Sequence, residues 1–385
     1  MVGACAGTMR WLEVLAVSVY TLAETGSAFS VAMMYFARTG PTLLCAPLAG
    51  ALAERAPRRI VLGIGCASAA LLSASLAWLA VSGALALWQV AAGAVVSGVF
   101  WSLEHTVRRT IARDVVATDT VGNAISLDSS TQNATRMLGP LAGGTLYAVI
   151  GMPGAYSLGA LLYGIAALLV LTMSVRLPAT VRTDDGLFSA LAEVLGYIAR
   201  ERVVAAVLSI TVCLNLFGSP YVSMVPVIGR EVLALNPLEI GMLMAVEGGG
   251  AMCGAGMLAL TMSSRFSLPL FTLGAIGFVG GIFAFSLASS FVMAGISLAV
   301  CGLGLGAFAA MQSTILLTHT QAEMRGRVMG MLAVTIGAGP IGTLVLGVAA
   351  ESFGAPDAVA VSSGLGLLAF VMVILRWPEL LRVRK

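Results

Sequence analysis

A small set of ionisable and amide side chains lies inside long apolar stretches of this sequence. A carboxyl group in such surroundings can take up and release a proton, and a neighbouring arginine stays charged and sets the affinity for that proton. Proton movement and the binding of a charged or polar substrate are the chemistry that such residues support. The candidates for this chemistry are Arg10, Glu13, Glu104, Asp128, Gln132, Arg136 and Glu247.

Asp128, Gln132 and Arg136 follow one another at intervals of four residues, so a helix presents them on one face. A glycine–proline segment continues this stripe as far as Gly143. We expect this face to look into a central cavity, because lipid would reject it. Two interpretations of Arg136 stay open. It lines a transport path with Asp128 or Glu13 as its acid, or it is a structural tie to an acid on an adjacent helix.

The other candidates also have two interpretations each. Glu13 shares a helix face with Arg10, and it either couples to protons or forms a permanent pair with that arginine. Glu104 belongs either to a coupling site or to a solvated cluster at a helix end. Glu247 either contacts the other half of the protein or binds substrate. Arg38 is expected near the outer membrane surface, with its side chain reaching toward water.

The composition identifies the chain as an integral membrane protein. Of its 385 residues 59% are hydrophobic and 10% are charged, whereas soluble domains carry about 25% charged residues. The six cysteines are scattered singly, without the spacing of a metal site. Neither a phosphate-binding loop nor an HExxH motif is present, so we expect no enzyme, no cofactor and no metal, and we expect no nucleic-acid partner.

The apolar segments predict an all-α membrane protein with twelve transmembrane helices in two six-helix bundles. Each segment approaches the roughly 20 residues that a spanning helix needs, and none shows the alternation of a barrel strand. The predicted helices cover residues 8–26, 30–53, 60–81, 86–107, 123–149, 155–175, 203–226, 238–260, 268–288, 292–317, 327–349 and 357–375.

Basic residues fall almost entirely on one side of this twelve-helix arrangement, which places both termini in the cytoplasm. The longest polar break lies between the sixth and seventh helices and contains an amphipathic segment at 187–200. The predicted domains are therefore an N-terminal bundle at 1–176, a cytoplasmic linker at 177–202 and a C-terminal bundle at 203–385.

The segment GALAERAPRRIVL at 50–62 resembles the cytoplasmic signature loop of the major facilitator superfamily. Glu54 and Pro57 stand where that family usually has aspartate and glycine. The resemblance implies that this loop is a cytoplasmic gate between the two bundles. The gate residues would be Gly50, Glu54, Arg55, Arg58 and Arg59.

Two further segments resemble the exporting branch of the same superfamily. GPLAGG, which contains Gly139, Pro140, Gly143 and Gly144, is similar to its antiporter motif, although Thr135 replaces the leading glycine. The segment 323–354 is similar to drug and siderophore exporters. Both imply export in exchange for protons.

We therefore expect a secondary transporter that exports a small organic molecule by proton antiport with alternating access. Uptake of a nutrient or metabolite by symport or facilitated diffusion is the alternative, and a membrane enzyme or receptor is a third class. The expected partners are the small-molecule substrate, protons and the lipid bilayer. The expected form is a monomer in the bacterial cytoplasmic membrane, with both termini in the cytoplasm.

Overall fold

The computed structural model describes residues 1–385 apart from 44, 46–56, 116–120, 173–186, 262–265 and 382–385. At some helix ends beside these gaps, Arg58 included, only the backbone is described. All regular elements within the described ranges are helices. Ten helical segments of this part of the chain are long and apolar enough to cross a membrane. The all-α membrane fold is thus confirmed, while the number of twelve spans stays a prediction.

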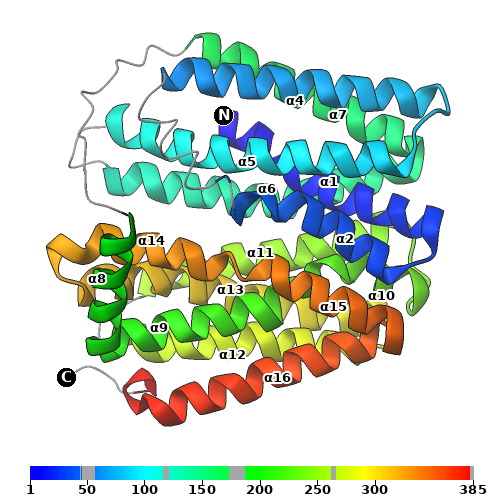
Figure 1. Cartoon of the computed structure of the whole chain (residues 1–385). Coiled ribbons are helices and arrows are strands. Elements are labelled where there is room, and N and C mark those ends of the chain that lie inside the picture. Colours follow the sequence, from blue (N-terminus) through cyan, green and yellow to red (C-terminus); the bar gives the residue numbers. More distant parts are fainter. Residues whose placement is uncertain (44, 46–56, 116–120, 173–186, 262–265, 382–385) are drawn as a thin grey trace. The chain divides into compact units, whose positions relative to one another are not determined.

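The principal helices are arranged along the chain as shown in Figure 1. Their bounds are α1 Val2–Thr25, α2 Ala28–Thr39, α4 Arg58–Val81, α5 Leu87–Val115, α6 Val121–Ile150, α7 Met152–Leu171, α8 Leu187–Arg200, α9 Arg202–Cys213, α10 Val225–Glu231, α11 Pro237–Thr261, α12 Ser267–Ser286, α13 Phe291–His319, α14 Arg325–Ile336, α15 Gly339–Phe353 and α16 Ala355–Arg376.

Two of the predicted spans differ from the ten apolar segments. The span predicted at 30–53 corresponds in its first part to α2, and most of its remainder lies outside the described residues. The span predicted at 123–149 corresponds to α6, which is long but carries many polar side chains. Pro140 lies inside α6 without ending it.

The predicted helices at 203–226 and 327–349 are interrupted in the structure. After α9 the chain forms a π-helix at Leu214–Gly218 and a 3-10 helix at Ser219–Ser223, which contains Pro220. A second break separates α14 from α15, where a proline is the second residue of α15. Proline has no N–H to donate, so it suits the start of a helical segment better than its interior.

Helix packing divides the chain into two compact units, and each is described here by itself. Unit 1 comprises Met1–Val181 and Val225–Gly248, and unit 2 comprises Arg182–Met224 and Gly249–Lys385. The segment Val225–Gly248 therefore packs with the N-terminal unit, although the predicted division placed it in the second bundle. The exact bundle boundaries stay a prediction.

The core of unit 1 lies between α1, α4, α5 and α7. Met9 and Leu12 of α1 are fully buried there with Tyr156 and Tyr163 of α7. Tyr163 packs edge-on against Phe100 of α5, with ring centroids 5.3 Å apart. Figure 1 shows α4, α5, α6 and α7 as long helices running side by side. The result is a helical framework into which α1 inserts.

Unit 2 is organised around the close pair α12 and α13. A β-carbon at Gly281 would lie 2.6 Å from the backbone nitrogen of Cys301, and one at Gly274 would lie 2.7 Å from that of Phe308. Only glycine permits this approach. Between membrane helices, where there is no hydrophobic driving force, such close packing supplies dispersion contacts.

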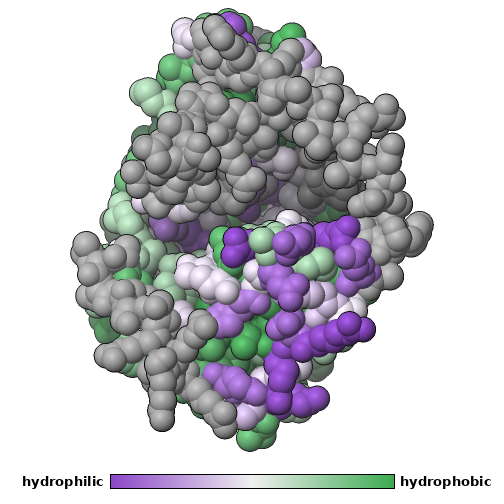
Figure 2. Space-filling model, turned by 90° about the vertical axis from the view of Figure 1, so that its left-hand side faces the viewer, coloured by the Kyte–Doolittle hydropathy of each residue, from purple (hydrophilic) through white to green (hydrophobic). Residues whose placement is uncertain are grey.

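The predicted amphipathic segment forms α8 and lies across one end of the unit 2 helices (Figure 1). Glu193 of α8 forms an ion pair with Arg327 of α14. The Tyr197 hydroxyl accepts a hydrogen bond of 3.1 Å from the backbone N–H of Gln321. Figure 2 shows hydrophilic side chains gathered at this end of the unit, which fits a surface facing water.

Candidate functional site

Several described arginines and carboxylates of unit 1 lie within its helices and contact one another or tryptophan rings. Each charge inside a membrane is costly, so the partner of each residue indicates its role. The arginines and acids come from α1, α2, α5, α6 and α11. They are Arg10, Glu13, Arg38, Glu104, Arg108, Asp128, Arg136 and Glu247.

Glu13 is buried near the middle of α1 and is bound from two other helices. Arg38 of α2 donates to its Oε2 atom, and the Ser97 hydroxyl of α5 donates to Oε1 over 3.2 Å. Only 3% of Glu13 and 6% of Arg38 are exposed. Beside this pair lies a cavity with room for about one water molecule. Both the charge and the hydrogen-bonding capacity of Glu13 are therefore largely satisfied inside the helices.

The expected positions of Arg38 and of the partner of Glu13 need correction. Arg38 does not reach toward water, because it is buried and binds Glu13. The Arg10–Glu13 pair, one of the two interpretations of Glu13, is not formed. The reason is the hairpin between α1 and α2, which turns at Gly26, a residue with a φ of 62°. Residues equally far from the turn lie opposite one another in antiparallel helices, and Glu13 and Arg38 are nearly so placed.

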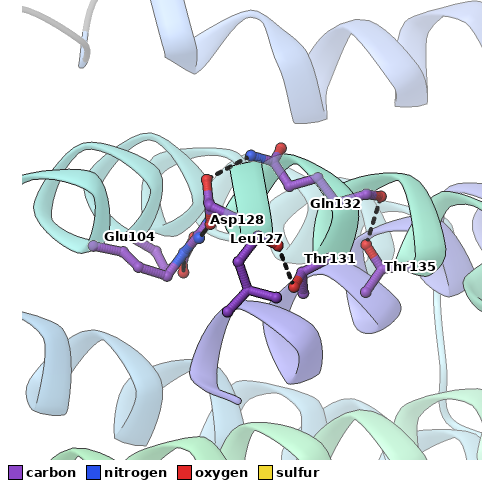
Figure 3. A network of polar contacts seen from close by, with 7 residues as sticks. Glu104, Leu127, Asp128, Thr131, Gln132 and Thr135 are labelled. Atoms are coloured by element: carbon purple, nitrogen blue, oxygen red, sulfur yellow. Dashed lines mark hydrogen bonds and ion pairs between the residues drawn. The ribbon is translucent and has the colours of Figure 1, made fainter. Parts of the chain in front are cut away.

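Glu104 and Asp128 share a single guanidinium group. Arg108 donates from Nε to Glu104 Oε1 over 2.5 Å, and it also forms an ion pair with Asp128. The Gln132 amide donates to Asp128 Oδ2 over 3.1 Å. Figure 3 shows Gln132 and Asp128 on one side of α6, with Glu104 on the neighbouring helix α5. Asp128 and Gln132 thus lie on one face of α6 as predicted, while the central cavity that this face and Arg136 were expected to line stays a prediction.

Small residues of α1 make room for this cluster. A β-carbon at Gly3 would lie 2.8 Å from Cζ of Arg108, and one at Gly7 would lie 2.5 Å from the Thr135 hydroxyl of α6. The glycines are one helical turn apart and therefore form a smooth strip on one face of α1. Because of this strip, the Arg108 side chain reaches both of its acids while α1 stays packed on α6.

Arg136 binds Glu247 of α11 in a two-pronged ion pair. Its Nε donates to Oε2 over 2.8 Å, and Nη2 donates to Oε1 over 2.6 Å. The guanidinium also lies over the Trp11 ring, 4.5 Å from the centroid. The acid on this arginine is thus neither Asp128 nor Glu13, the two acids named from the sequence. It lies on an adjacent helix, as the structural interpretation of Arg136 predicted.

The glycines of the GPLAGG segment are contact points for two helices. β-Carbons at Gly139 and Gly143 would meet backbone carbonyl oxygens of α1 at 2.7 and 2.9 Å. A β-carbon at Gly144 would collide with the carbonyl oxygen of Pro237 in α11. These glycines therefore fix how closely α6 lies against α1 and α11.

Pro140 adds a further effect in the same helix. It has no N–H to donate to the carbonyl of Arg136, four residues earlier. That carbonyl instead faces Gly248, where an added β-carbon would lie 2.9 Å from the oxygen. The Arg136–Glu247 pair thus lies beside a point where α6 and α11 touch through their backbones.

Arg10 differs from the other three arginines. Its guanidinium lies over the Trp101 ring of α5, 3.9 Å from the centroid, and 5.4 Å from the centroid of Trp11. The described side chains supply no carboxylate partner for it. It is partly buried, so some of its surface remains accessible.

The predicted gate loop is described only at its end. Gly50, Glu54 and Arg55 lie outside the described residues, and the side chain of Arg58 is not described. Arg59 donates from Nε to the carbonyl of Val170 over 3.1 Å and also bonds the carbonyl of Leu171. It therefore satisfies the last carbonyls of α7, and the gate itself stays a prediction.

Sequence reasoning missed Ser97, Arg108 and the two tryptophans as parts of the site. The spacing of Glu104 and Arg108, four residues apart on one helix, was a usable signal for their ion pair. Trp101 and His105 are also four residues apart, and this spacing was a usable signal for the contact between their rings, whose centroids are 5.4 Å apart. The contact of Trp101 with Arg10 joins distant parts of the chain and had no local signal.

Residues 1–343 match the model described as Major Facilitator Superfamily. The staphyloferrin A transporter of Staphylococcus aureus is 23% identical over 375 residues, which cover 94% of this chain and 91% of that protein. The multidrug efflux pump Tap of Mycobacterium bovis is 25% identical over 257 residues, which cover 64% of this chain and 60% of the pump.

Solved structures show the same fold. An inward-facing, unoccupied bacterial homologue of the human lysosomal transporter Spinster aligns with a TM-score of 0.74 and 14% identity, covering 100% of this chain and 98% of that one. A D-xylose-proton symporter aligns with a TM-score of 0.73 and 12% identity, covering 97% and 95%. At such low identity these likenesses concern the fold alone.

Proposed function

The chain belongs to the major facilitator superfamily and is therefore a multi-pass membrane transporter, and on that premise we propose that it exports a small organic molecule in exchange for protons. A siderophore transporter and a multidrug efflux pump among its relatives support the choice of cargo. The GPLAGG segment, with its resemblance to an antiporter motif, supports the exchange. We further propose that the protein works as a monomer in the bacterial cytoplasmic membrane.

The observation that carries the proton exchange is the pair of carboxylates on Arg108. Arg108 binds both Glu104 and Asp128, so two carboxylates lie close together on one guanidinium among the membrane helices. Two carboxylates this close repel each other, and sharing a proton between them relieves that repulsion. We propose that this pair takes up the proton on one side of the membrane and releases it on the other.

Glu13 is less suited to this role than the sequence alone suggested. Arg38 donates a hydrogen bond to this carboxylate, and Ser97 donates a second one. These two contacts join the carboxylate on α1 to α2 and α5. We therefore assign Glu13 to holding α1, α2 and α5 together rather than to proton transfer.

Antiport follows if protonation and substrate binding favour opposite orientations of the transporter. A proton drives transport only when the two orientations bind it unequally. The Arg108 cluster lies on α5 and α6, the latter also carrying Arg136 and the antiporter-like glycines. Protonation of this pair would therefore act on a helix that contacts both α1 and α11.

Everted membrane vesicles test the direction and the coupling together. Respiration acidifies their lumen, which quenches acridine orange. A compound exported by proton antiport enters the lumen as protons leave, so its addition restores fluorescence. We would add compounds of differing charge to vesicles with and without the protein, using amounts confirmed by blotting. We expect dequenching by at least one compound, and only when the protein is present.

Variants then identify the coupling acid. Asp128→Asn and Glu104→Gln should each abolish dequenching while counterflow of the same compound persists, and Glu13→Gln should change both readouts together. Uptake by symport, or facilitated diffusion, gives compound movement without dequenching and would overturn the antiport proposal. Full dequenching by the Asp128→Asn/Glu104→Gln double variant would exclude the carboxylate pair.

A further inference from the structure

Arg10 is a cation that has no counter-ion among the described residues, in contrast to three other arginines of unit 1. Arg38, Arg108 and Arg136 each bind at least one carboxylate. The guanidinium of Arg10 has instead the faces of two indole rings, Trp101 and Trp11.

The aromatic contacts compensate only part of the charge. An arginine stays protonated in proteins, so it cannot lower the cost of its burial by becoming neutral. A cation over an aromatic ring is stabilised much less than a guanidinium paired with a carboxylate in the same surroundings. The difference leaves Arg10 with an attraction for an anion that the described residues do not satisfy.

The geometry favours a particular kind of anion. Cζ of Arg10 lies over the Trp101 ring, 3.9 Å from its centroid. The N–H groups lie in the plane of the guanidinium, and the described residues offer them no acceptor. A planar carboxylate approaching in that plane accepts two parallel hydrogen bonds.

The surroundings of Arg10 are positive on one side as well. Arg136 lies over Trp11, 4.5 Å from the same ring that Arg10 approaches. Its own charge is matched by Glu247, so this second guanidinium does not demand an additional anion. The two indoles provide flat apolar surfaces against which the body of an organic acid can pack.

We propose that Arg10, with the rings of Trp101 and Trp11, binds a carboxylate group of the transported molecule, which makes this protein a transporter of organic anions. This inference rests on the proposed transport function and adds the chemical class of its substrate. Arg10 supplies the charge and the paired donors, and the indoles hold the guanidinium in place.

The test measures binding separately from transport. Purified full-length protein is titrated with cyclohexanecarboxylate and adipate, and with their neutral amides, cyclohexanecarboxamide and adipamide. Tryptophan fluorescence reports occupancy because two of the five tryptophans contact Arg10. We expect at least one acid to change the fluorescence in a saturable way, while its amide binds roughly tenfold to a hundredfold more weakly.

Variants connect this signal to the site. Arg10→Gln should weaken binding of the acid to the level of the amide, and Arg10→Lys should recover part of the affinity as a point charge without the planar fork. Trp101→Phe should reduce the fluorescence change. The matched control is Arg230→Gln, which removes an exposed arginine of the same unit and should leave the titration unchanged.

Several results would overturn the anion site. These are equal binding of acids and amides, absence of binding by both acids, unchanged affinity in Arg10→Gln, and an equal response to chloride or inorganic phosphate. The vesicle assay separates this failure from that of the export proposal. Dequenching by cations alone leaves proton antiport standing without an anion site, whereas Arg10-dependent acid binding without dequenching leaves the site standing without proton antiport.

Discussion

Arg136 shows how a single residue serves packing and charge balance together. Its guanidinium contacts the Trp11 ring of α1 and both oxygens of Glu247 on α11. One side chain of α6 thus connects three helices. A buried pair of this kind contributes little compared with an apolar replacement, but breaking it leaves a charge alone in the membrane.

Arg136→Ala should therefore destabilise the protein by about 3–5 kcal/mol, the usual cost of removing one partner of a buried pair. Arg136→Lys should lie between this variant and the wild type, because lysine cannot reproduce the two-pronged contact. The measurement is thermal unfolding of the purified protein in detergent. The double variant Arg136→Gln/Glu247→Gln should unfold closer to the wild type than Arg136→Ala does. Identical melting temperatures for the single variants would contradict a buried pair.

At the scale of elements, glycine positions determine which helices approach closely. The face of α6 that carries Gly139 and Gly143 touches α1, and Gly144 touches α11. In the first half of α11, Gly241 and Gly248 meet the backbone of α6 in turn, at Pro140 and at Arg136. The glycines of α6 and those of α11 thus meet each other's helix, which explains why Val225–Gly248 packs with unit 1.

Gly144→Ala should disturb this contact. The new methyl group would collide with the Pro237 carbonyl and lie 3.2 Å from the Cα atoms of Leu238 and Gly241. Since backbone cannot rotate out of the way, we expect a loss of about 1–3 kcal/mol of stability and a loss of dequenching.

Gly164→Ala is the matched control, because nothing lies within 4 Å of a β-carbon at that position of α7. Alanine favours helix more than glycine does, so this variant should unfold at the wild-type temperature or slightly above it. Equal melting temperatures and equal transport for the two alanine variants would show that the α6–α11 contact is not tight.

At the scale of the whole molecule, the topology predicted from the basic residues can be tested by cysteine labelling. Ser82 lies in the exposed turn after α4, and Ala199 is exposed on α8. In a background without the six native cysteines, a membrane-impermeant maleimide should label Ser82→Cys in intact cells. It should label Ala199→Cys only after the cells are permeabilised. The reverse pattern would invert the orientation.

The sequence by itself determined the class of protein and most of its helices. A bilayer core of fixed thickness requires apolar helices of about 20 residues. Each such helix can be recognised from its own consecutive residues, without knowledge of the rest of the fold. The spacing of four residues between Asp128 and Gln132 was also visible in the local sequence, and in the structure these two side chains form a hydrogen bond. The interruptions of α9 and α14 were missed, because hydropathy does not register the backbone effect of a proline.

Only the tertiary structure decided which charges meet. Arg136 and Glu247 are 111 residues apart, and Arg38 and Glu13 are 25 apart. Any of the arginines considered could pair with several acids as far as the sequence shows. The choice depends on which helix faces come together, and glycine contacts such as Gly144 with Pro237 set those faces. For the same reason the position of Arg10 on two indole rings, without an ion pair among the described residues, became visible only in three dimensions.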